Sequence, residues 1–140
     1  FTALPLGPGI GSDSNTQIRL TFSETVNPTG VWAQLLCSIS GSRTIGSGLG
    51  VTILDPVFVL TPSVNLSPGD ACTLTVFANQ VSDDDAIDPP DLMTADFVAS
   101  FNVDAAPAVI GVIPPNGGAN VRTTNDVEVQ FSEGVTVSPT

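Results

Sequence analysis

The sequence of 140 residues contains no histidine and no lysine, and its only basic residues are Arg19, Arg43 and Arg122. Without histidine the chain cannot form a Ser-His-Asp or Cys-His arrangement, and it has no histidine to act as a general base or a metal ligand. Without lysine it cannot form a Schiff base or the phosphate contact of a P-loop. Because these groups carry much of enzyme chemistry, we expect that the chain is not an enzyme.

The shortage of basic residues also limits the partners that the chain can bind. Its formal net charge is −11. Phosphate neutralisation requires clustered lysine and arginine, so nucleic acid is not expected as a partner, and an anionic membrane surface is disfavoured for the same reason. No apolar run is long enough to span a bilayer, so we expect no membrane insertion. An acidic chain of this kind is typical of a secreted protein or of a cation binder.

Charged residues make up only 12% of the chain, which contains 13 glycines and 12 prolines. This composition favours short strands and turns over helices. About seven segments with strand character follow one another at near-regular spacing, with turn signals between them. The pattern predicts an all-β protein, an antiparallel β-sandwich. The expected strands are Phe1–Leu4, Ile18–Val26, Val31–Ile39, Val51–Leu54, Val57–Thr61, Ala71–Ala78 and Phe97–Val103.

The strand pattern leads to further expectations about turns and the core. Ser40–Gly50 is rich in glycine and serine and is expected to be a loop, and Leu66–Asp70 has proline and glycine in the order that a type II turn prefers. Trp32 is expected to anchor the core, but it alternates out of phase with Leu35 and Cys37, so one of these two sets is expected to face the core only partly. The expected core consists of Leu20, Phe22, Leu74, Val76, Phe101 and either Phe97 or Val98.

One phrase occurs twice in the chain. Ile18–Val26 reads I-R-L-T-F-S-E-T-V, and Val127–Val135, 109 positions later, reads V-E-V-Q-F-S-E-G-V. The same offset aligns Thr2–Gly11 with Gly111–Asn120 without a gap. An internal repeat is the signature of tandem modules. We therefore predict one module over residues 1–106 and the opening strands of a second, incomplete copy over residues 107–140.

The second copy is expected to need a partner. It contains only two expected strands, and an isolated pair of strands is at best marginally stable in water. Its apolar residues Val127, Val129 and Phe131 must be covered, and its free edges must be paired. We expect the completing strands to come either from an adjacent module of the same chain or from a neighbouring copy by strand addition, which would build a fibre or array.

Cys37 and Cys72 are the only cysteines and lie in two of the expected strands. In an exported sandwich we expect them to form a disulfide, with two free buried thiols as the alternative. Closing a loop of about 35 residues would stabilise the fold by roughly 3–4 kcal/mol. We expect no metal at the cysteines, since two thiols without histidine leave the coordination unfinished.

Six of the fourteen acidic residues lie within fourteen positions of the loop Ser82–Asp96, with no basic residue among them. Such crowding is unfavourable unless solvent, salt or a cation relieves it. Calcium uses closely spaced oxygen ligands, although D-D-D-A-I-D-P-P-D lacks the turn glycine and the closing glutamate of an EF-hand. A solvated acidic loop and a structural calcium site both stay open. The candidate calcium ligands are Asp83, Asp84, Asp85, Asp88, Asp91 and Asp96.

Glu24 and Glu133 recur at the same place in the two copies, two positions after a core phenylalanine. One interpretation is that each lies at a strand end or turn, with its carboxylate accepting backbone amides. The other is that each acts as a ligand.

The chain resembles a known family at these motifs. F-S-E-x-V after an alternating strand, preceded by P-x-x-G, and the later L-S-P-G-D-A-C-T-L-T-V with V-S-D are similar to the bacterial immunoglobulin-like modules first described in S-layer proteins. The stretch T-V-F-A-N-Q-V-S-D-D-D-A-I-D-P-P-D-L-M-T-A-D-F-V-A-S-F is similar to copies of that module in large secreted bacterial proteins, some with lamin-tail or extracellular nuclease domains. The resemblance covers nearly all of residues 1–104 and the opening of the second copy.

The resemblance implies an Ig-like β-sandwich outside the cell, used as a spacer, stalk or adhesive surface. The family usually has tyrosine where this chain has Cys72, which supports the disulfide. We therefore expect a non-enzymatic structural or assembly module of a secreted or cell-surface protein. The alternatives are a ligand-binding adhesin and an accessory module of an extracellular hydrolase such as a nuclease.

Overall fold

The computed structural model describes residues 2–6 by their backbone alone, and residues 17–85 and 91–136 in full. The chain divides into two compact units, Phe1–Ala105 and Ala106–Thr140. Nearly all regular structure in the described part is β-strand, and no helix there is long and apolar enough to cross a membrane.

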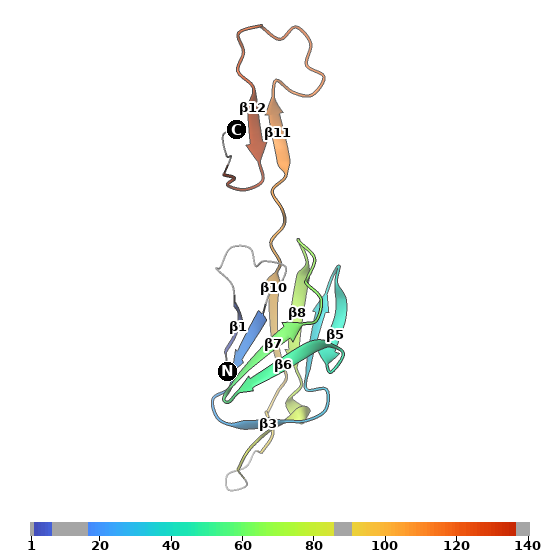
Figure 1. Ribbon diagram of the computed structural model, residues 1–140, viewed down its shortest axis with the longest axis vertical. Coiled ribbons are helices and arrows are strands. Elements are labelled where there is room, and N and C mark those ends of the chain that lie inside the picture. The colour runs from blue at the N-terminus through green and yellow to red at the C-terminus, as the bar shows by residue number, and fades with distance from the viewer. Residues whose placement is uncertain (1, 7–16, 86–90, 137–140) are drawn as a thin grey trace. The chain divides into compact units, whose positions relative to one another are not determined.

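The first unit contains one large sheet that curls over on itself (Figure 1). Its strands are β1 (Thr2–Leu6), β2 (Gln17–Thr21), β4 (Ala33–Cys37), β5 (Gly41–Ile45), β6 (Gly48–Leu54), β7 (Val57–Pro62), β8 (Ala71–Val76) and β10 (Phe97–Asn102). They lie in the order β1-β2-β7-β6-β5-β4-β8-β10. Every neighbouring pair is antiparallel except β5 and β6, which meet in parallel over only two residue pairs. The sheet turns over at this narrow junction, and its two halves form the predicted Ig-like sandwich.

Two short strands and one helical turn close one end of the sandwich. β3 (Val26–Pro28) pairs with β9 (Val81–Asp83), and the 3-10 turn η1 (Ala78–Gln80) leads from β8 into β9. Asp96 accepts a hydrogen bond of 2.8 Å from the backbone N–H of Ala78. The carboxylate therefore satisfies a donor at the start of this turn, where no helical partner exists.

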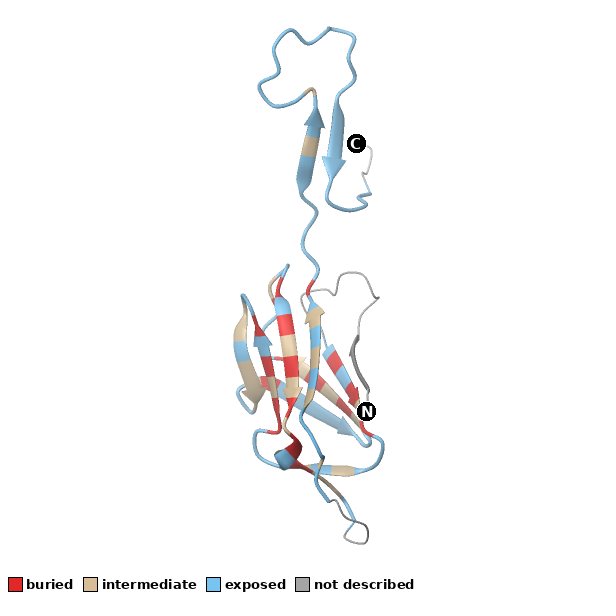
Figure 2. Ribbon diagram, turned by 180° about the vertical axis from the view of Figure 1, so that it is seen from behind, coloured by how far each residue is buried: buried red, intermediate tan, exposed pale blue. Residues whose placement is uncertain are grey.

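Alternation along the strands places the core between the two halves, as the buried bands of Figure 2 show. The ring of Phe58 lies at the centre, with edge contacts to Phe22 and Trp32 at centroid distances of 5.2 and 5.6 Å. The predicted core residues Leu20, Phe22, Leu74 and Val76 are buried. Phe97 and Phe101 pack against this core from β10, whereas Val98 points outwards.

Two sequence-based expectations are wrong. The segment Ser40–Gly50 is not a loop, because it contains β5 and the start of β6. Glycine and serine have low strand propensity, but pairing with β4 supplies the hydrogen bonds and overrides it. Trp32, Leu35 and Cys37 are all buried. Strand alternation does not apply to Trp32, because β4 begins at Ala33. Trp32 can therefore face the core together with Leu35 and Cys37.

In the second unit, residues 106–136 form one antiparallel hairpin, β11 (Val109–Ile113) with β12 (Glu128–Phe131). Its register pairs Gly111 with Gln130, Val112 with Val129 and Ile113 with Glu128. Subtracting 109 from these numbers gives the pairs that join β1 to β2: residue 2 with 21, 3 with 20 and 4 with 19. The two hairpins therefore share one pairing register.

Candidate functional site

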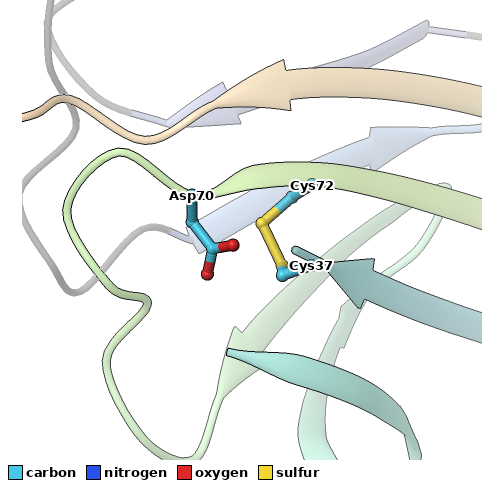
Figure 3. A group of neighbouring side chains, drawn as sticks. All are labelled: Cys37, Asp70 and Cys72. Carbon is cyan, nitrogen blue, oxygen red and sulfur yellow. A yellow bond between two sulfur atoms is a disulfide. The ribbon is translucent and has the colours of Figure 1, made fainter. Parts of the chain in front are cut away.

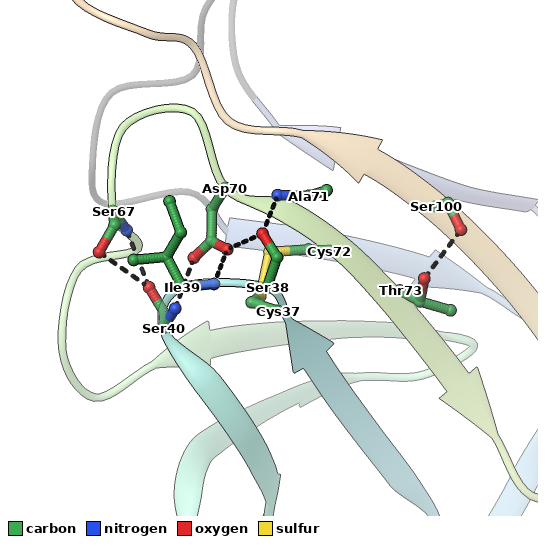
Figure 4. Close-up of a disulfide and its surroundings, with 10 residues drawn as sticks. All are labelled: Cys37, Ser38, Ile39, Ser40, Ser67, Asp70, Ala71, Cys72, Thr73 and Ser100. Carbon is green, nitrogen blue, oxygen red and sulfur yellow. Dashed lines mark hydrogen bonds between the residues drawn. A yellow bond between two sulfur atoms is a disulfide. The ribbon is translucent and has the colours of Figure 1, made fainter.

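The only fully buried charged side chain in the described part of the first unit is Asp70, directly before β8. Its carboxylate accepts hydrogen bonds from the backbone amides of Ile39 at 2.7 Å and Ser40 at 3.0 Å, and from the hydroxyl of Ser38 at 3.0 Å (Figure 4). These donors all lie in the turn between β4 and β5. The local sequence folds in this way because Gly69 adopts φ +76°, which brings Asp70 back towards the neighbouring turn.

These donors determine the charge state of Asp70. Burial raises the pKa of the carboxyl, but the hydrogen bonds from Ser40, Ile39 and Ser38 outweigh burial and lower the pKa to about 2. A carboxylate that accepts several hydrogen bonds is stabilised in its charged form. Asp70 is therefore an ionised, fully hydrogen-bonded anion at neutral pH.

Serine side chains of the β4–β5 turn also bind the backbone on either side of Asp70. Ser38 Oγ accepts a hydrogen bond from the Ala71 amide at 3.0 Å, and Ser40 Oγ accepts one from the Ser67 amide at 2.9 Å. We call Ser38, Ser40, Ser67 and Asp70 the Asp70 network. It joins the β4–β5 turn to the β7–β8 turn through side chains that are far apart in the sequence.

The disulfide lies next to this network (Figure 3). Cys37 on β4 pairs directly with Cys72 on β8, and the structure joins the two sulfurs, which confirms the predicted bond. Among the residues described in full, Cys37, Asp70 and Cys72 form the only group of three possible metal ligands whose donor atoms lie within 4.8 Å of one another. Because both sulfurs are joined to each other, this group is a structural cross-link beside a buried anion.

Comparison with protein families agrees with this architecture. The family model described as bacterial Ig-like domain matches residues 5–102. The chain belongs to this family. Bacterial Ig-like domains are non-catalytic and are typically extracellular or surface-exposed. Searches of curated proteins and of solved structures gave no match.

The Asp70 network of this bacterial Ig-like module was not foreseen from the sequence. The pattern L-S-P-G-D predicts a turn and gives Asp70 no role beyond it. One feature of the sequence does indicate such a network. Asp70 directly precedes an apolar strand and has no basic residue nearby in the sequence, so its carboxylate needs hydrogen-bond donors from elsewhere in the fold. Its hydrogen-bond partners are the Ser38 hydroxyl and the backbone amides of Ile39 and Ser40, about thirty positions earlier. No spacing rule connects such a carboxylate with those donors, which lie in a turn of another strand pair.

The structure spreads the candidate calcium ligands over different elements. Asp83 lies in β9, the backbone carbonyl of Asp91 accepts a hydrogen bond from the Asp83 amide, and Asp96 binds the start of η1. The Asp83 Oδ1 atom is buried and has no hydrogen-bond partner. Asp88 lies outside the described residues. Within the described residues, no three of these aspartates form a group of neighbouring ligand atoms, so calcium binding stays a prediction that involves Asp88.

Glu24 and Glu133 occupy equivalent places in the two units. Each is an exposed residue in a bend that follows a strand, β2 in one case and β12 in the other. This position agrees with the interpretation as a strand end.

Proposed function

We propose that this bacterial Ig-like module is a non-enzymatic structural spacer of a secreted or cell-surface protein, joined in series with further modules. The observation that supports this proposal is the anchoring of the residues through which the chain leaves the sandwich. Val103 is buried and donates its amide to the Asp70 carbonyl at 2.7 Å. The Gly69 amide in turn lies 3.1 Å from the carbonyls of both Val103 and Asp104.

These bonds connect the exit of the module to its cross-linked end. Tension along the chain at Asp104 would act first on β10 and on the turn that contains Gly69 and Asp70. Asp70 is bound to the β4–β5 turn, and the disulfide joins β8 to β4. Load at the exit is therefore shared among β4, β8 and β10 instead of peeling β10 away alone. Resistance to unfolding under tension is useful to a module that connects other parts of a protein, because force passes through it from one end to the other.

The aromatic residues provide little support for an adhesin. Every aromatic side chain that the structure describes in the first unit is buried or half-buried. Trp32, Phe22 and Phe58 pack against one another in the core. Exposed aromatic residues are common anchors of protein-binding surfaces. Their absence from the described surface of the sandwich favours a spacer over a ligand-binding role.

Single-molecule force spectroscopy tests the mechanical part of this proposal. The 140-residue chain would be pulled through handles at both ends, in its oxidised form and as the Asp70→Asn variant. We expect the variant to unfold at lower force, because its exit turn loses the charged anchor. Gln34→Ala is a matched control, since the Gln34 side chain donates a hydrogen bond to the exposed Ser42 hydroxyl and is not part of the Asp70 network. Equal unfolding forces for the parent chain and Asp70→Asn would contradict the load-sharing role.

The location of the protein is tested separately. An antibody raised against the 140-residue chain should label intact producing cells or the medium, and external protease should remove the cell-bound signal. Labelling only after the cells are opened would contradict the proposal of a secreted or cell-surface spacer, whatever the force measurements show.

A further inference from the structure

Strand β6 of the first unit has one edge that is free along most of its length. β7 pairs with one edge of β6 from Leu49 onwards, whereas β5 meets the other edge only at Gly48 and Leu49 (Figure 1). No other strand in the described part of the chain pairs with that second edge beyond Leu49. The side chains of Val51 and Ile53 are 37% and 58% exposed. An apolar strand with an unpaired edge is therefore accessible within the first unit.

The backbone of β6 alternates between these two edges. The Gly48 carbonyl accepts a hydrogen bond of 3.0 Å from the Ser63 amide, directly after β7, and the Leu49 carbonyl accepts one of 3.3 Å from the residue directly after β5. Successive residues of a paired strand direct their amides and carbonyls to opposite edges. Val51 and Ile53 therefore direct their backbone groups to the free edge, as Leu49 does.

The free edge of β6 lacks the usual protection. Native edge strands commonly carry charged residues, proline or a bulge, because unpaired amides and carbonyls invite pairing with another chain. β6 reads G-L-G-V-T-I-L, contains no charged residue and no proline, and pairs with β7 in a regular register. By contrast, β10, at one end of the sheet, is flanked in the sequence by Asp96 and Asp104 and exposes Ser100 and Asn102. β6 is therefore the less protected of these two edges.

We propose that β6 is a self-association edge, which pairs antiparallel with β6 of a second copy of this chain around a two-fold axis at Thr52. This register places Val51 opposite Ile53 of the second copy, and the symmetry creates the same pair twice. Both residues direct their backbone groups to the free edge, so each pair can exchange two hydrogen bonds. The surface involved belongs to the first unit alone, so this inference does not depend on the proposed spacer function.

The side chains of β6 are complementary to themselves in this register. Val51 and Ile53 lie on the face of the sheet that carries the buried side chains of β7, so their pairing would extend the apolar core of each copy at its rim. On the other face, Leu54 lies opposite Gly50, which leaves room for the large side chain, and Thr52 lies opposite itself. Threonine pairs directly opposite each other are favourable in antiparallel sheets. The pattern of sizes therefore favours a second copy as the occupant.

The absence of charge allows two acidic chains to approach each other at β6. The formal net charge of each chain is −11, and the nearest acidic residue in the sequence is Asp55. In the proposed register Asp55 lies opposite Leu49 of the second copy, so the two Asp55 residues are roughly 20 Å apart along the strands. This distance exceeds the Debye length of about 8 Å at physiological salt. Association should therefore strengthen when salt is added to a solution of low ionic strength.

Hydrogen exchange of the 140-residue chain over a concentration series tests the pairing at single residues. A short strand pair forms a weak interface, so the series runs from about 10 μM to about 1 mM. We expect exchange of the Val51 and Ile53 amides to slow by about fivefold or more as the concentration rises. The amides of Thr52 and Leu54 face β7 and should be protected at every concentration. Unchanged exchange at Val51 and Ile53 throughout the series would overturn the proposal.

A matched pair of variants tests the position of the interface by sedimentation equilibrium. Thr52→Lys places like charges opposite each other at the two-fold axis and should weaken association by about tenfold or more. Val98→Lys is the control, since it adds the same charge at an exposed position of β10 and should leave association unchanged. Trp32 fluorescence verifies that both variants are folded. Equal association of the parent chain and Thr52→Lys, or a loss with Val98→Lys alone, would overturn the proposal.

A cross-linking variant tests the register. In Thr52→Cys the two-fold axis would bring two thiols together, so oxidation by diamide should join two chains, as seen on a gel without reducing agent. Leu54→Cys is the control, because its thiol would lie opposite Gly50 and should give little cross-linked product. Concentration-dependent protection of β6 without the cross-link at position 52 would identify another pairing strand and overturn the proposal. Thr52 is not part of the Asp70 network, so these outcomes are distinguishable from failure of the spacer function.

Discussion

Cys37 and Cys72 lie directly opposite each other on the adjacent strands β4 and β8, with their Cα atoms 4.0 Å apart. The bond therefore joins two strands within one half of the sandwich and does not bridge the two halves. Both cysteines are buried, and Asp70 lies beside them (Figure 3). The cross-link and the anion together fix the end of the module from which the chain continues.

The first prediction concerns this bond. Mass spectrometry without reduction should find Cys37 and Cys72 joined in the folded protein. The double variant Cys37→Ala, Cys72→Ala should lose roughly 3–4 kcal/mol of unfolding free energy, because its unfolded chain gains the entropy of an open loop. Urea unfolding measures this loss. Two alkylatable thiols in the folded protein would contradict both the bond and the expected exported state.

The second prediction concerns the pH dependence of stability. The pKa of Asp70 is lowered from 3.8 to about 2 by the fold. The charged form is therefore favoured in the folded state, and its contribution is fully present above pH 4 and is lost as the pH falls towards 2. The contribution is roughly 1–2 kcal/mol after allowance for solvent screening.

Asp70→Asn isolates this contribution from the other carboxylates. We expect the difference in unfolding free energy between the parent chain and the variant to be constant above pH 4 and to shrink between pH 4 and pH 2. Urea unfolding at several pH values, followed by Trp32 fluorescence, measures the difference. A difference that does not change over this interval would mean that Asp70 stabilises the fold without its charge.

The sequence predicted the features of this protein that depend on local patterns. Alternation identified Leu20, Phe22, Leu74 and Val76 as core residues, and Pro68–Gly69 marked a turn in which Gly69 has positive φ. Local patterns did not predict the strand in Ser40–Gly50, because pairing with a distant strand decides the structure there. β5 (Gly41–Ile45) begins in a stretch rich in glycine and serine, which indicates a loop, and it forms because β4 offers it a partner.

The Asp70 network could not be predicted for a related reason. Its donors lie in the turn between β4 and β5, about thirty positions earlier in the chain, and no property of the sequence near Asp70 reveals them. The acidic loop shows the opposite case. Its composition is conspicuous in the sequence, yet the fold assigns Asp96 to the start of η1 and Asp83 to β9.

The third prediction concerns calcium. If the acidic loop binds calcium, the thermal midpoint of the 140-residue chain should be higher in millimolar calcium than in chelator, whereas equal midpoints would mean that the loop is only solvated. A ligand that binds only the folded state would raise the midpoint through linkage. A rise that is weakened by Asp85→Asn and by Asp88→Asn would establish a calcium site in this loop. Magnesium at the same concentration is the control for simple charge screening.

The fourth prediction compares the same substitution at two equivalent positions. Phe22→Ala should reduce the unfolding free energy of the first unit by about 3–5 kcal/mol, because it removes a buried ring in contact with Phe58 and leaves a cavity. Phe131→Ala in the same chain should change the stability of that unit by less than about 0.5 kcal/mol, since Phe131 is 37% exposed and belongs to the other compact unit. Trp32 is the only tryptophan and lies beside Phe58, so its fluorescence reports the first unit alone.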